Sequence, residues 1–341
     1  MDFSSSGGPD PHIIKIRPTP AGKSVLRLWE AILSIGHAAA RLTAIVGFLA
    51  MLAASCAGDQ SRDRHAGPAD VPLGPDNKQL WWVPIDTGAE QYLLETTVYR
   101  PSGPGPFPLV TINHGKPRPG TTDPQAMHPG YGAAAHWFAN RGFAVAVPMR
   151  RGYGLSQGPI SDTVGPCSDR DYFATALKTA ADMEGVIAYL RNQPFVDGNR
   201  VVVVGHSYGG LGALTVAYNR TQGVIGIINF AGGAGSNRPG EICSGSERLI
   251  AAVGRLGERN LLPQIWLYAV NDHYFDPSLA HAMAEGYRVG SRGPVTFVDL
   301  PQFDDHGHLT FSRGDPAIWA ASVDRYLGSV PIATSSGVST P

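Results

Sequence analysis

One short stretch, residues 201–214, constrains the fold of this chain more than any other. It reads VVVVGHSYGGLGAL, so four consecutive valines run into a cluster of glycines around one serine, Ser207. A strand without polar alternation is expected to be buried on both faces, as in a parallel sheet covered by helices. The small residues after the serine indicate that a helix begins at once. The stretch therefore predicts a buried strand, a sharp turn that carries Ser207, and a helix.

The chain repeats this pattern from about residue 79 onward, where strand-like and helix-like segments alternate with short breaks between them. Such alternation predicts an α/β fold with a mostly parallel sheet of eight strands and helices on both faces. Sites in such sheets form beyond the carboxyl ends of the strands. The expected strands are 79–86, 90–101, 108–115, 143–152, 200–207, 224–233, 263–272 and 294–302, and the expected helices are 132–142, 171–193, 209–220, 246–260, 277–290 and 316–328.

The pentapeptide at residues 205–209, GHSYG, matches the pattern G-x-S-x-G. In this pattern a strained strand-to-helix turn exposes the serine hydroxyl, and the glycines avoid collisions where the chain reverses. The alternative is that Ser207 is only a small residue in a tight turn. The buried strand before it and the helix after it favour a nucleophile.

A serine nucleophile needs a base, and the base needs a carboxylate that fixes its tautomer. In the hydrolase order both partners follow the serine, the carboxylate first and the histidine last. Asp272 comes directly after the strand-like IWLYAV, and His308 lies in the loop DDHGHLTF after the last strand. We expect these two residues as the acid and the base, with His306 as the alternative base.

Attack on a carbonyl group places negative charge on its oxygen, which two backbone N–H groups have to stabilise. One is expected from Tyr208, the residue after the nucleophile, at the start of a helix. The other is expected from Lys116, in the loop NHGK that follows the strand TI, where Gly115 allows close approach. The alternative for this loop is a plain turn.

These motifs together resemble those of the α/β-hydrolase superfamily, and within it the dienelactone-hydrolase-like and prolyl-oligopeptidase-like serine hydrolases. The resemblance covers most of residues 80–328 and rests on NHG, RRGYGLSQG, GHSYGG, YAVNDHYF and DDHGHLTF. It implies that Ser207 is the nucleophile, Asp272 the acid and His308 the base. Dienelactone hydrolases carry cysteine where this chain has Ser207, so lactone specificity is not implied. The large propeller of true oligopeptidases is not expected either.

The N-terminal part differs in character from the rest. Residues 42–55, LTAIVGFLAMLAAS, form an uncharged apolar run that ends at Cys56, and basic residues precede it. Positive, then apolar, then small residues are typical of a secretory signal. LAASC resembles a lipobox with Cys56 as the lipidated residue, whereas cleavage after Ala57 would leave no lipid. The third interpretation is a helix from a gene whose true start lies later. The basic residues are Lys15, Arg17, Lys23 and Arg27.

Two cysteines remain after the apolar run, Cys167 and Cys243. Both lie in polar, loop-like sequence. In an exported chain a disulfide between them is expected, because disulfides persist in oxidising compartments. The alternative is two small buried thiols.

Several other functions lack support in the sequence. The formal net charge is −1 and no run of basic residues is present, which argues against a nucleic-acid partner. No G-x-G-x-x-G follows a strand, and neither H-E-x-x-H nor C-x-x-C occurs, so no cofactor or metal is expected. His306 and His308 lie near Asp304 and Asp305, but two histidines in one loop, two positions apart, are weak evidence for a metal site.

We therefore expect an exported serine hydrolase that cleaves small carboxylic esters through an acyl-enzyme. The alternatives are a peptidase or amidase with the same triad, and a non-catalytic surface protein on a hydrolase scaffold. The protein is expected to be periplasmic or secreted, or attached to a membrane through Cys56. Its expected segments are a signal at 1–56, a flexible linker at 57–78, the catalytic domain at 79–329 and a disordered tail at 330–341.

Overall fold

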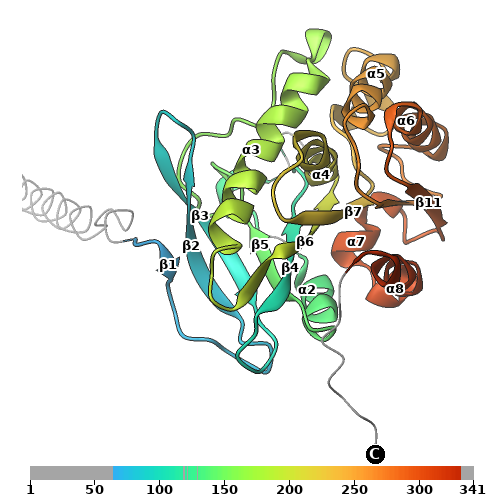
Figure 1. Cartoon of the computed structure of the whole chain (residues 1–341). Helices are drawn as coiled ribbons and strands as arrows, with labels where there is room; N and C mark the ends of the chain where they lie inside the picture. Colours follow the sequence, from blue (N-terminus) through green and yellow to red (C-terminus); the bar gives the residue numbers. More distant parts are fainter. Residues whose placement is uncertain (1–63, 118–119, 121, 129, 332–341) are drawn as a thin grey trace, which may run out of the picture. The chain divides into compact units, whose positions relative to one another are not determined.

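A nine-stranded sheet forms the centre of the computed structural model, which describes residues 64–117, 120, 122–128 and 130–331 (Figure 1). Strands β4, β5, β6, β7, β10 and β11 run parallel to one another, and β1, β2 and β3 pair antiparallel at one edge. The order across the sheet is β1 (Gly67–Pro68), β2 (Gln79–Asp86), β3 (Gln91–Tyr99), β5 (Ala144–Pro148), β4 (Phe107–Asn113), β6 (Val196–His206), β7 (Val224–Phe230), β10 (Gln264–Ala269) and β11 (Val295–Leu300).

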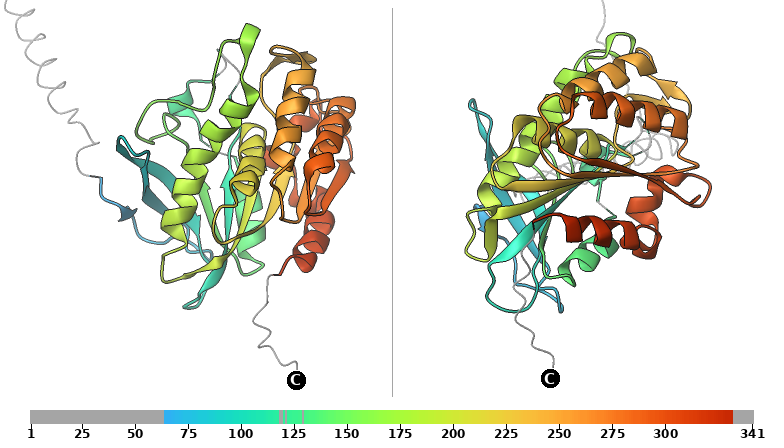
Figure 2. Two further views of the ribbon diagram at one scale, coloured as in Figure 1. Left: turned by 45° about the horizontal axis from the view of Figure 1, so that its top comes forward. Right: turned by 45° about the vertical axis from the view of Figure 1, so that its right-hand side comes forward.

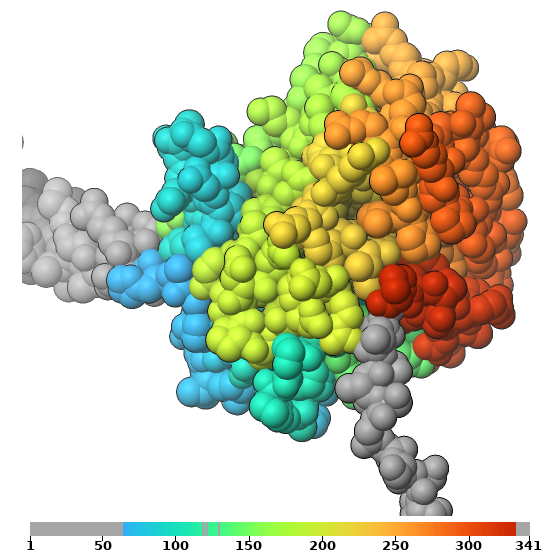
Figure 3. Space-filling view, in the orientation of Figure 1, coloured from blue at the N-terminus to red at the C-terminus, as the bar shows by residue number. Residues whose placement is uncertain are grey.

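Helices cover both faces of the sheet (Figure 2). One face is covered by α3 (Tyr172–Leu190), α4 (Tyr208–Asn219), α5 (Ser246–Gly257) and α6 (Pro277–Gly290). The other is covered by α2 (Gly132–Ala139), α7 (Thr310–Arg313) and α8 (Ala320–Ser329). In space-filling form, the green to orange segments, which include α3, α5 and α6, make up the upper and right-hand part of the side shown (Figure 3).

The valines of β6 explain why this strand has no polar alternation. Val201 and Val203 pack into the core under α3 to α6, whereas Val202 and Val204 pack into the core under α2, α7 and α8. Successive side chains of a strand point to opposite faces, so a strand with a helix layer on each side needs an apolar residue at every position. The predicted α/β-hydrolase architecture is confirmed.

Two details of the prediction need correction. The sheet has nine strands, because the short strand β1 pairs with β2 within the segment predicted as a flexible linker. The Asp70 side chain accepts a hydrogen bond from the Leu80 amide, and the Arg64 guanidinium lies 4.2 Å from the Trp82 ring centre. These contacts attach residues 64–78 to the sheet. No local sequence pattern predicts them.

Some predictions fall on residues that the structure does not describe. The proposed signal, the lipidation residue Cys56 and most of the tail at 330–341 lie outside the described residues. Among the described residues, no helix combines the length and the apolar character that a membrane span requires. Within the same residues, no group of His, Cys, Asp and Glu side chains could hold a metal ion.

Candidate active site

Ser207 occupies the turn between β6 and α4. Its backbone has φ 57° and ψ −120°, a conformation with positive φ that costs energy in a residue with a side chain. Hydrogen bonds hold the turn in place: the Ser207 amide donates to Phe230 O over 3.0 Å, and its carbonyl accepts from the amides of Leu211 and Gly233, both at 3.1 Å. The structure therefore has the strained strand-to-helix turn that the sequence predicts.

The two glycines of the pentapeptide are required by close approach. A Cβ atom on Gly205 would lie 2.1 Å from the Gly209 carbonyl oxygen, and one on Gly209 would lie 2.1 Å from the Asn113 carbonyl oxygen. Both distances are far below van der Waals contact. Any side chain at either position would push α4 away from β6 or β4, and Ser207 would move with it.

Asp272 and His308 meet at the carboxyl ends of β10 and β11. Asp272 Oδ2 lies 2.9 Å from His308 Nδ1, and Asp272 Oδ1 accepts hydrogen bonds from the amides of Tyr274 and Phe275. Both side chains are buried. Burial alone would raise the pKa of Asp272, but the His308 ring and the two amides outweigh it, so this pKa lies below its ordinary value. The carboxylate is thus ionised and able to orient the imidazole.

His306, the alternative base, and Asp276, which lies near Asp272 in the sequence, have other partners. His306 is the N-cap of the short turn at Gly307–Leu309, where its ring accepts a hydrogen bond from the His308 amide. Asp276 caps α6 by accepting from the amides of Ser278 and Leu279. The structure therefore pairs Asp272 with His308, the combination that the sequence favours.

A pocket of about 760 Å³ contains Ser207, His308 and His306. Among the described residues, the Ser207 hydroxyl and the His308 ring make no hydrogen bond with each other. In hydrolases without substrate this contact is often long and tightens only when substrate binds. Ser207, His306 and His308 therefore line one common pocket.

The two expected oxyanion donors line the same pocket. Tyr208 is the first residue of α4, and the first N–H groups of a helix have no partner within it. Lys116 follows Gly115, where an added Cβ would lie 2.9 Å from Ser207 Cβ. Gly115 therefore lets the loop that carries Lys116 come into contact with the nucleophile turn, as expected.

A buried ion cluster that the sequence analysis did not identify holds the loop at residues 114–116. The Arg150 guanidinium donates to the carbonyls of His114 and Gly115 and pairs with Asp162 at 3.1 Å. The Asp162 carboxylate also accepts from the Lys116 ammonium at 3.0 Å. Arg150 belongs to the quoted motif RRGYGLSQG, which could have drawn attention to it, whereas no local signal marks Asp162.

His114 contributes to the same loop through its ring. Its side chain is fully buried, Nδ1 lies 2.6 Å from the Gly115 carbonyl oxygen, and Nε2 accepts from the Arg150 amide at 3.0 Å. Burial, and the positive charge of Arg150, hold the pKa of His114 well below its ordinary value. A neutral ring with hydrogen on Nδ1 satisfies both contacts. His114 thus holds the loop at residues 114–116 against Arg150.

His206 connects the loop at residues 114–116 to the loop that carries His308. Its Nε2 lies 2.7 Å from the His308 carbonyl oxygen, which can only accept, so Nε2 carries the hydrogen. Its Nδ1 then accepts from the Tyr131 hydroxyl at 2.8 Å, and that hydroxyl accepts from the Gly115 amide at 3.4 Å. Burial, together with the charge of His308, lowers the pKa of His206 to about 3. These contacts give His206 a structural role.

We expect His206→Gln to weaken the pH dependence of folding between pH 4 and 5.5. In that range the unfolded chain protonates His206 and the folded chain does not, so stability rises with pH by about 1.4 kcal/mol per pH unit for this group. Asp162 and Asp272, whose pKa values are lowered, act mainly below this range. Urea unfolding at several pH values measures the slope.

The matched control for this prediction is His65→Gln. His65 is exposed in the folded protein as it is in the unfolded chain, so its replacement should leave the slope unchanged. A slope equal to that of the wild type in the His206 variant would contradict a neutral, buried His206.

The Cys167–Cys243 disulfide, which the sequence predicts, joins the segment before α3 to the hairpin of β8 (Ser236–Arg238) and β9 (Glu241–Ile242). Ser244 accepts from the Arg170 amide at 2.7 Å and donates to the Cys167 carbonyl at 2.9 Å. The two segments come from distant parts of the sequence and border the reaction pocket through Arg170 and Asn237. The disulfide therefore fixes one wall of the pocket.

One segment of the chain matches a known protein family. Residues 90–244, less than half of the chain, match the model of the X-Pro dipeptidyl-peptidase family (S15 family). No curated protein sequence matches the chain.

Among solved structures, the acetyl xylan esterase from Paenibacillus sp. R4 is similar, with a TM-score of 0.54 and 16% identity over 79% of this chain and 90% of the other. An esterase from Pyrococcus furiosus has a TM-score of 0.53 and 16% identity, over 78% of this chain and 97% of the other. Porphyromonas gingivalis dipeptidyl peptidase 4 has a TM-score of 0.53 and 14% identity, over 75% of this chain and 36% of the other.

The fold and the turn at Ser207 define the class. The chain has the α/β-hydrolase fold, and the match at residues 90–244 together with the esterase and peptidase neighbours is consistent with a serine hydrolase. Sequence identities this low establish only the shared fold. The substrate has to be inferred from the chemistry of the pocket.

Proposed function

We propose that the protein hydrolyses carboxylic esters, with Ser207 as nucleophile, His308 as base and Asp272 as the orienting carboxylate. The observation that carries the proposal is the 2.9 Å pairing of Asp272 with His308 beside the pocket that contains Ser207. A serine hydroxyl is a weak nucleophile, and a histidine held by an ionised carboxylate is the group that activates it.

In the proposed reaction the Ser207 oxygen attacks the ester carbonyl while His308 Nε2 takes the hydroxyl proton. Asp272 keeps the other hydrogen on Nδ1 and stabilises the charged ring. The amides of Tyr208 and Lys116 stabilise the negative oxygen of the tetrahedral intermediate. His308 then gives its proton to the departing alcohol, which leaves an acyl-enzyme. Water repeats the cycle and releases the acid.

A dipeptidyl peptidase is the second candidate, which the match at residues 90–244 favours. Such an enzyme has to bind the cationic N-terminus of a peptide, for which a carboxylate is the fitting partner. The described residues that line the Ser207 pocket include no Asp or Glu, whereas Glu241, Glu247 and Asp276 line a neighbouring pocket. This distribution of charge supports ester cleavage in the first pocket.

We expect Ser207→Ala to abolish labelling by a fluorophosphonate probe and to lower ester hydrolysis at least about 10⁴-fold, because the acyl-enzyme cannot form. 4-Nitrophenyl esters tested beside aminoacyl-proline anilides separate the two candidates. Ser244→Ala, which removes a hydroxyl that lines the neighbouring pocket, should keep the labelling. Equal labelling of the wild type and of Ser207→Ala would remove the serine hydrolase mechanism, and faster cleavage of anilides than of esters would favour the peptidase.

We further propose that the protein is exported, and that Cys56 is either lipidated or removed near a cleavage site. The disulfide supports export because oxidising compartments preserve such bonds. We expect cell fractionation to find the protein outside the cytoplasm. Metabolic labelling with a fatty acid should mark the wild type and not Cys56→Ser if the residue is lipidated, and a mature chain that begins after Ala57 would show ordinary cleavage.

A further inference from the structure

The reaction pocket has an excess of positive charge. Three described lining residues carry fixed positive charges, Lys116, Arg170 and Arg313, and none of the described lining residues carries a carboxylate. When the adjoining Arg150 and the carboxylates of Asp162 and Asp272 are included, four positive and two negative charges leave a net charge of about +2 at the pocket. A neutral substrate would gain nothing from this field, whereas an anionic one would be attracted to it.

Arg170 is a lining cation that is partly buried and forms no ion pair with any described residue. Its Nε and Nη1 atoms are buried, and neither has a hydrogen-bond partner among the described residues. Burying a guanidinium without a partner costs free energy, so such a group in a folded protein calls for an explanation. Because the residue is partly exposed and lines the pocket, a counter-charge can approach it from the pocket side.

The acidic residues on either side of Arg170 in the sequence are engaged elsewhere. Asp169 pairs with Arg248 at 2.6 Å on the exposed surface. Asp171 is the N-cap of α3 and accepts from the Ala174 amide at 2.8 Å. Neither carboxylate forms an ion pair with Arg170.

We propose that Arg170 binds a carboxylate group of the substrate, so that the enzyme cleaves esters of acids or alcohols that also carry a carboxylate. The proposal rests on the proposed ester hydrolysis at Ser207 and specifies its substrate class. Arg170 and Ser207 line the same pocket, so a dicarboxylic monoester can place its ester at the serine and its free carboxylate at the guanidinium. A guanidinium–carboxylate contact is among the stronger hydrogen-bonded pairs.

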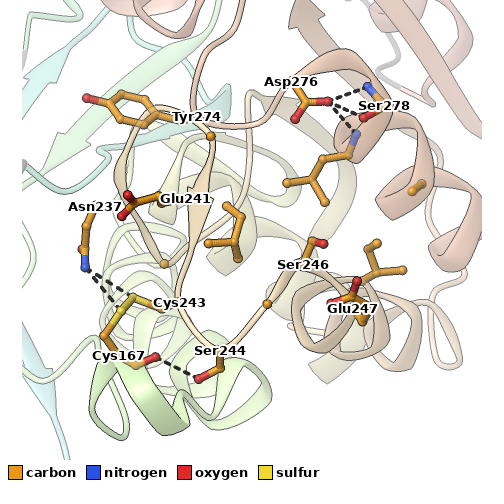
Figure 4. Close-up of a pocket in the computed structure, with 17 residues that line it drawn as sticks. Cys167, Asn237, Glu241, Cys243, Ser244, Ser246, Glu247, Tyr274, Asp276 and Ser278 are labelled. Atoms are coloured by element: carbon orange, nitrogen blue, oxygen red, sulfur yellow. Dashed lines mark hydrogen bonds between the residues drawn. A yellow bond between two sulfur atoms is a disulfide. The ribbon is translucent and has the colours of Figure 1, made fainter.

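The disulfide holds Arg170 in position for this role. The Arg170 amide donates to Ser244 Oγ, Ser244 donates to the Cys167 carbonyl, and Cys167 is bonded to Cys243 next to Ser244. Figure 4 shows the disulfide and the bond from Ser244 to the Cys167 carbonyl, with the Asn237 amide directed at both sulfur atoms. Asn237 lines both this second pocket, of about 680 Å³, and the reaction pocket. The cross-link is thus part of the wall that carries the guanidinium.

The test compares two esters of equal chain length, mono-4-nitrophenyl glutarate, which carries a carboxylate, and 4-nitrophenyl pentanoate, which does not. We expect the wild type to prefer the glutarate. Arg170→Gln should lower kcat/KM for the glutarate about 10- to 100-fold and leave the pentanoate within about threefold, because only the charged contact is lost. Arg248→Gln is the matched control: it removes an exposed arginine of α5 that pairs with Asp169, the neighbour of Arg170, and should keep the preference.

A second variant tests the role of the cross-link. Replacing both cysteines by serine should raise KM for the glutarate several-fold with little effect on the pentanoate, since Arg170 loses its fixed position.

Melting temperatures separate the proposal from a structural role of Arg170. The Arg170→Gln variant should melt no lower than the wild type, because it removes an unpaired buried charge.

Two results would overturn the assignment of Arg170. One is a wild type that hydrolyses the pentanoate as well as the glutarate, and the other is an equal loss on both esters in Arg170→Gln. Failure of the proposed ester hydrolysis at Ser207 would give a different result. In that case Ser207→Ala would hydrolyse both esters at the wild-type rate.

Discussion

Asp272→Asn is expected to lower kcat for a 4-nitrophenyl ester about 10⁴-fold while the protein stays folded. An amide in place of Asp272 can donate to His308 Nδ1, which shifts the ring hydrogen to Nε2. The base then has no free lone pair for the Ser207 proton. The amides of Tyr274 and Phe275 still find an acceptor in the asparagine oxygen, so the turn after β10 is preserved.

The matched control is Asp276→Asn, four residues further along the chain. Asp276 caps α6, and asparagine serves as an N-cap about as well as aspartate, so this variant should retain activity and stability. Steady-state kinetics with both variants, and circular dichroism for folding, make the comparison. Loss of activity below about tenfold in folded Asp272→Asn would show that another group orients the base.

Local sequence predicts those parts of the site that consecutive residues form. The turn at Ser207 could be predicted because its glycines, the buried strand before it and the helix after it are all consecutive in the chain. Asp272 and His308 could be predicted because each follows a strand-like run, and parallel strands bring their carboxyl ends to one edge of the sheet. The buried strands could be predicted because an apolar residue at every position indicates a strand that is covered on both faces.

The parts that sequence could not reveal depend on contacts between distant segments. Asp162 lies in a stretch without regular structure, and nothing near it predicts that Arg150 and Lys116 converge on its carboxylate. Tyr131 reaches His206 from 75 positions away in the chain. The attachment of β1 to β2 likewise depends on long-range pairing, which is why residues 64–78 looked like a linker.

Asp162→Asn is expected to destabilise the protein by about 3–5 kcal/mol and also to lower kcat, because it breaks a buried ion pair and frees the oxyanion loop. The Asp162 and Arg150 side chains are 4% and 3% exposed, so the guanidinium would be left buried and uncompensated. Arg150 also holds the carbonyls of His114 and Gly115, next to the Lys116 amide. A shift of this loop by a fraction of an ångström weakens oxyanion stabilisation, with an expected loss of about 10- to 10³-fold in kcat.

Asp182→Asn separates the two effects of Asp162→Asn. Asp182 forms a similarly buried pair with Arg151 at 2.7 Å and also accepts from the Arg151 amide at 2.9 Å, but it makes no contact with the loop at residues 114–116 within the described part of the chain. Both variants should therefore lower the urea midpoint by similar amounts, and only Asp162→Asn should lower kcat at a temperature where both are folded. Equal kcat in the two variants would mean that the ion cluster supports the fold alone, and that the oxyanion loop keeps its geometry without the pairing of Arg150 to Asp162.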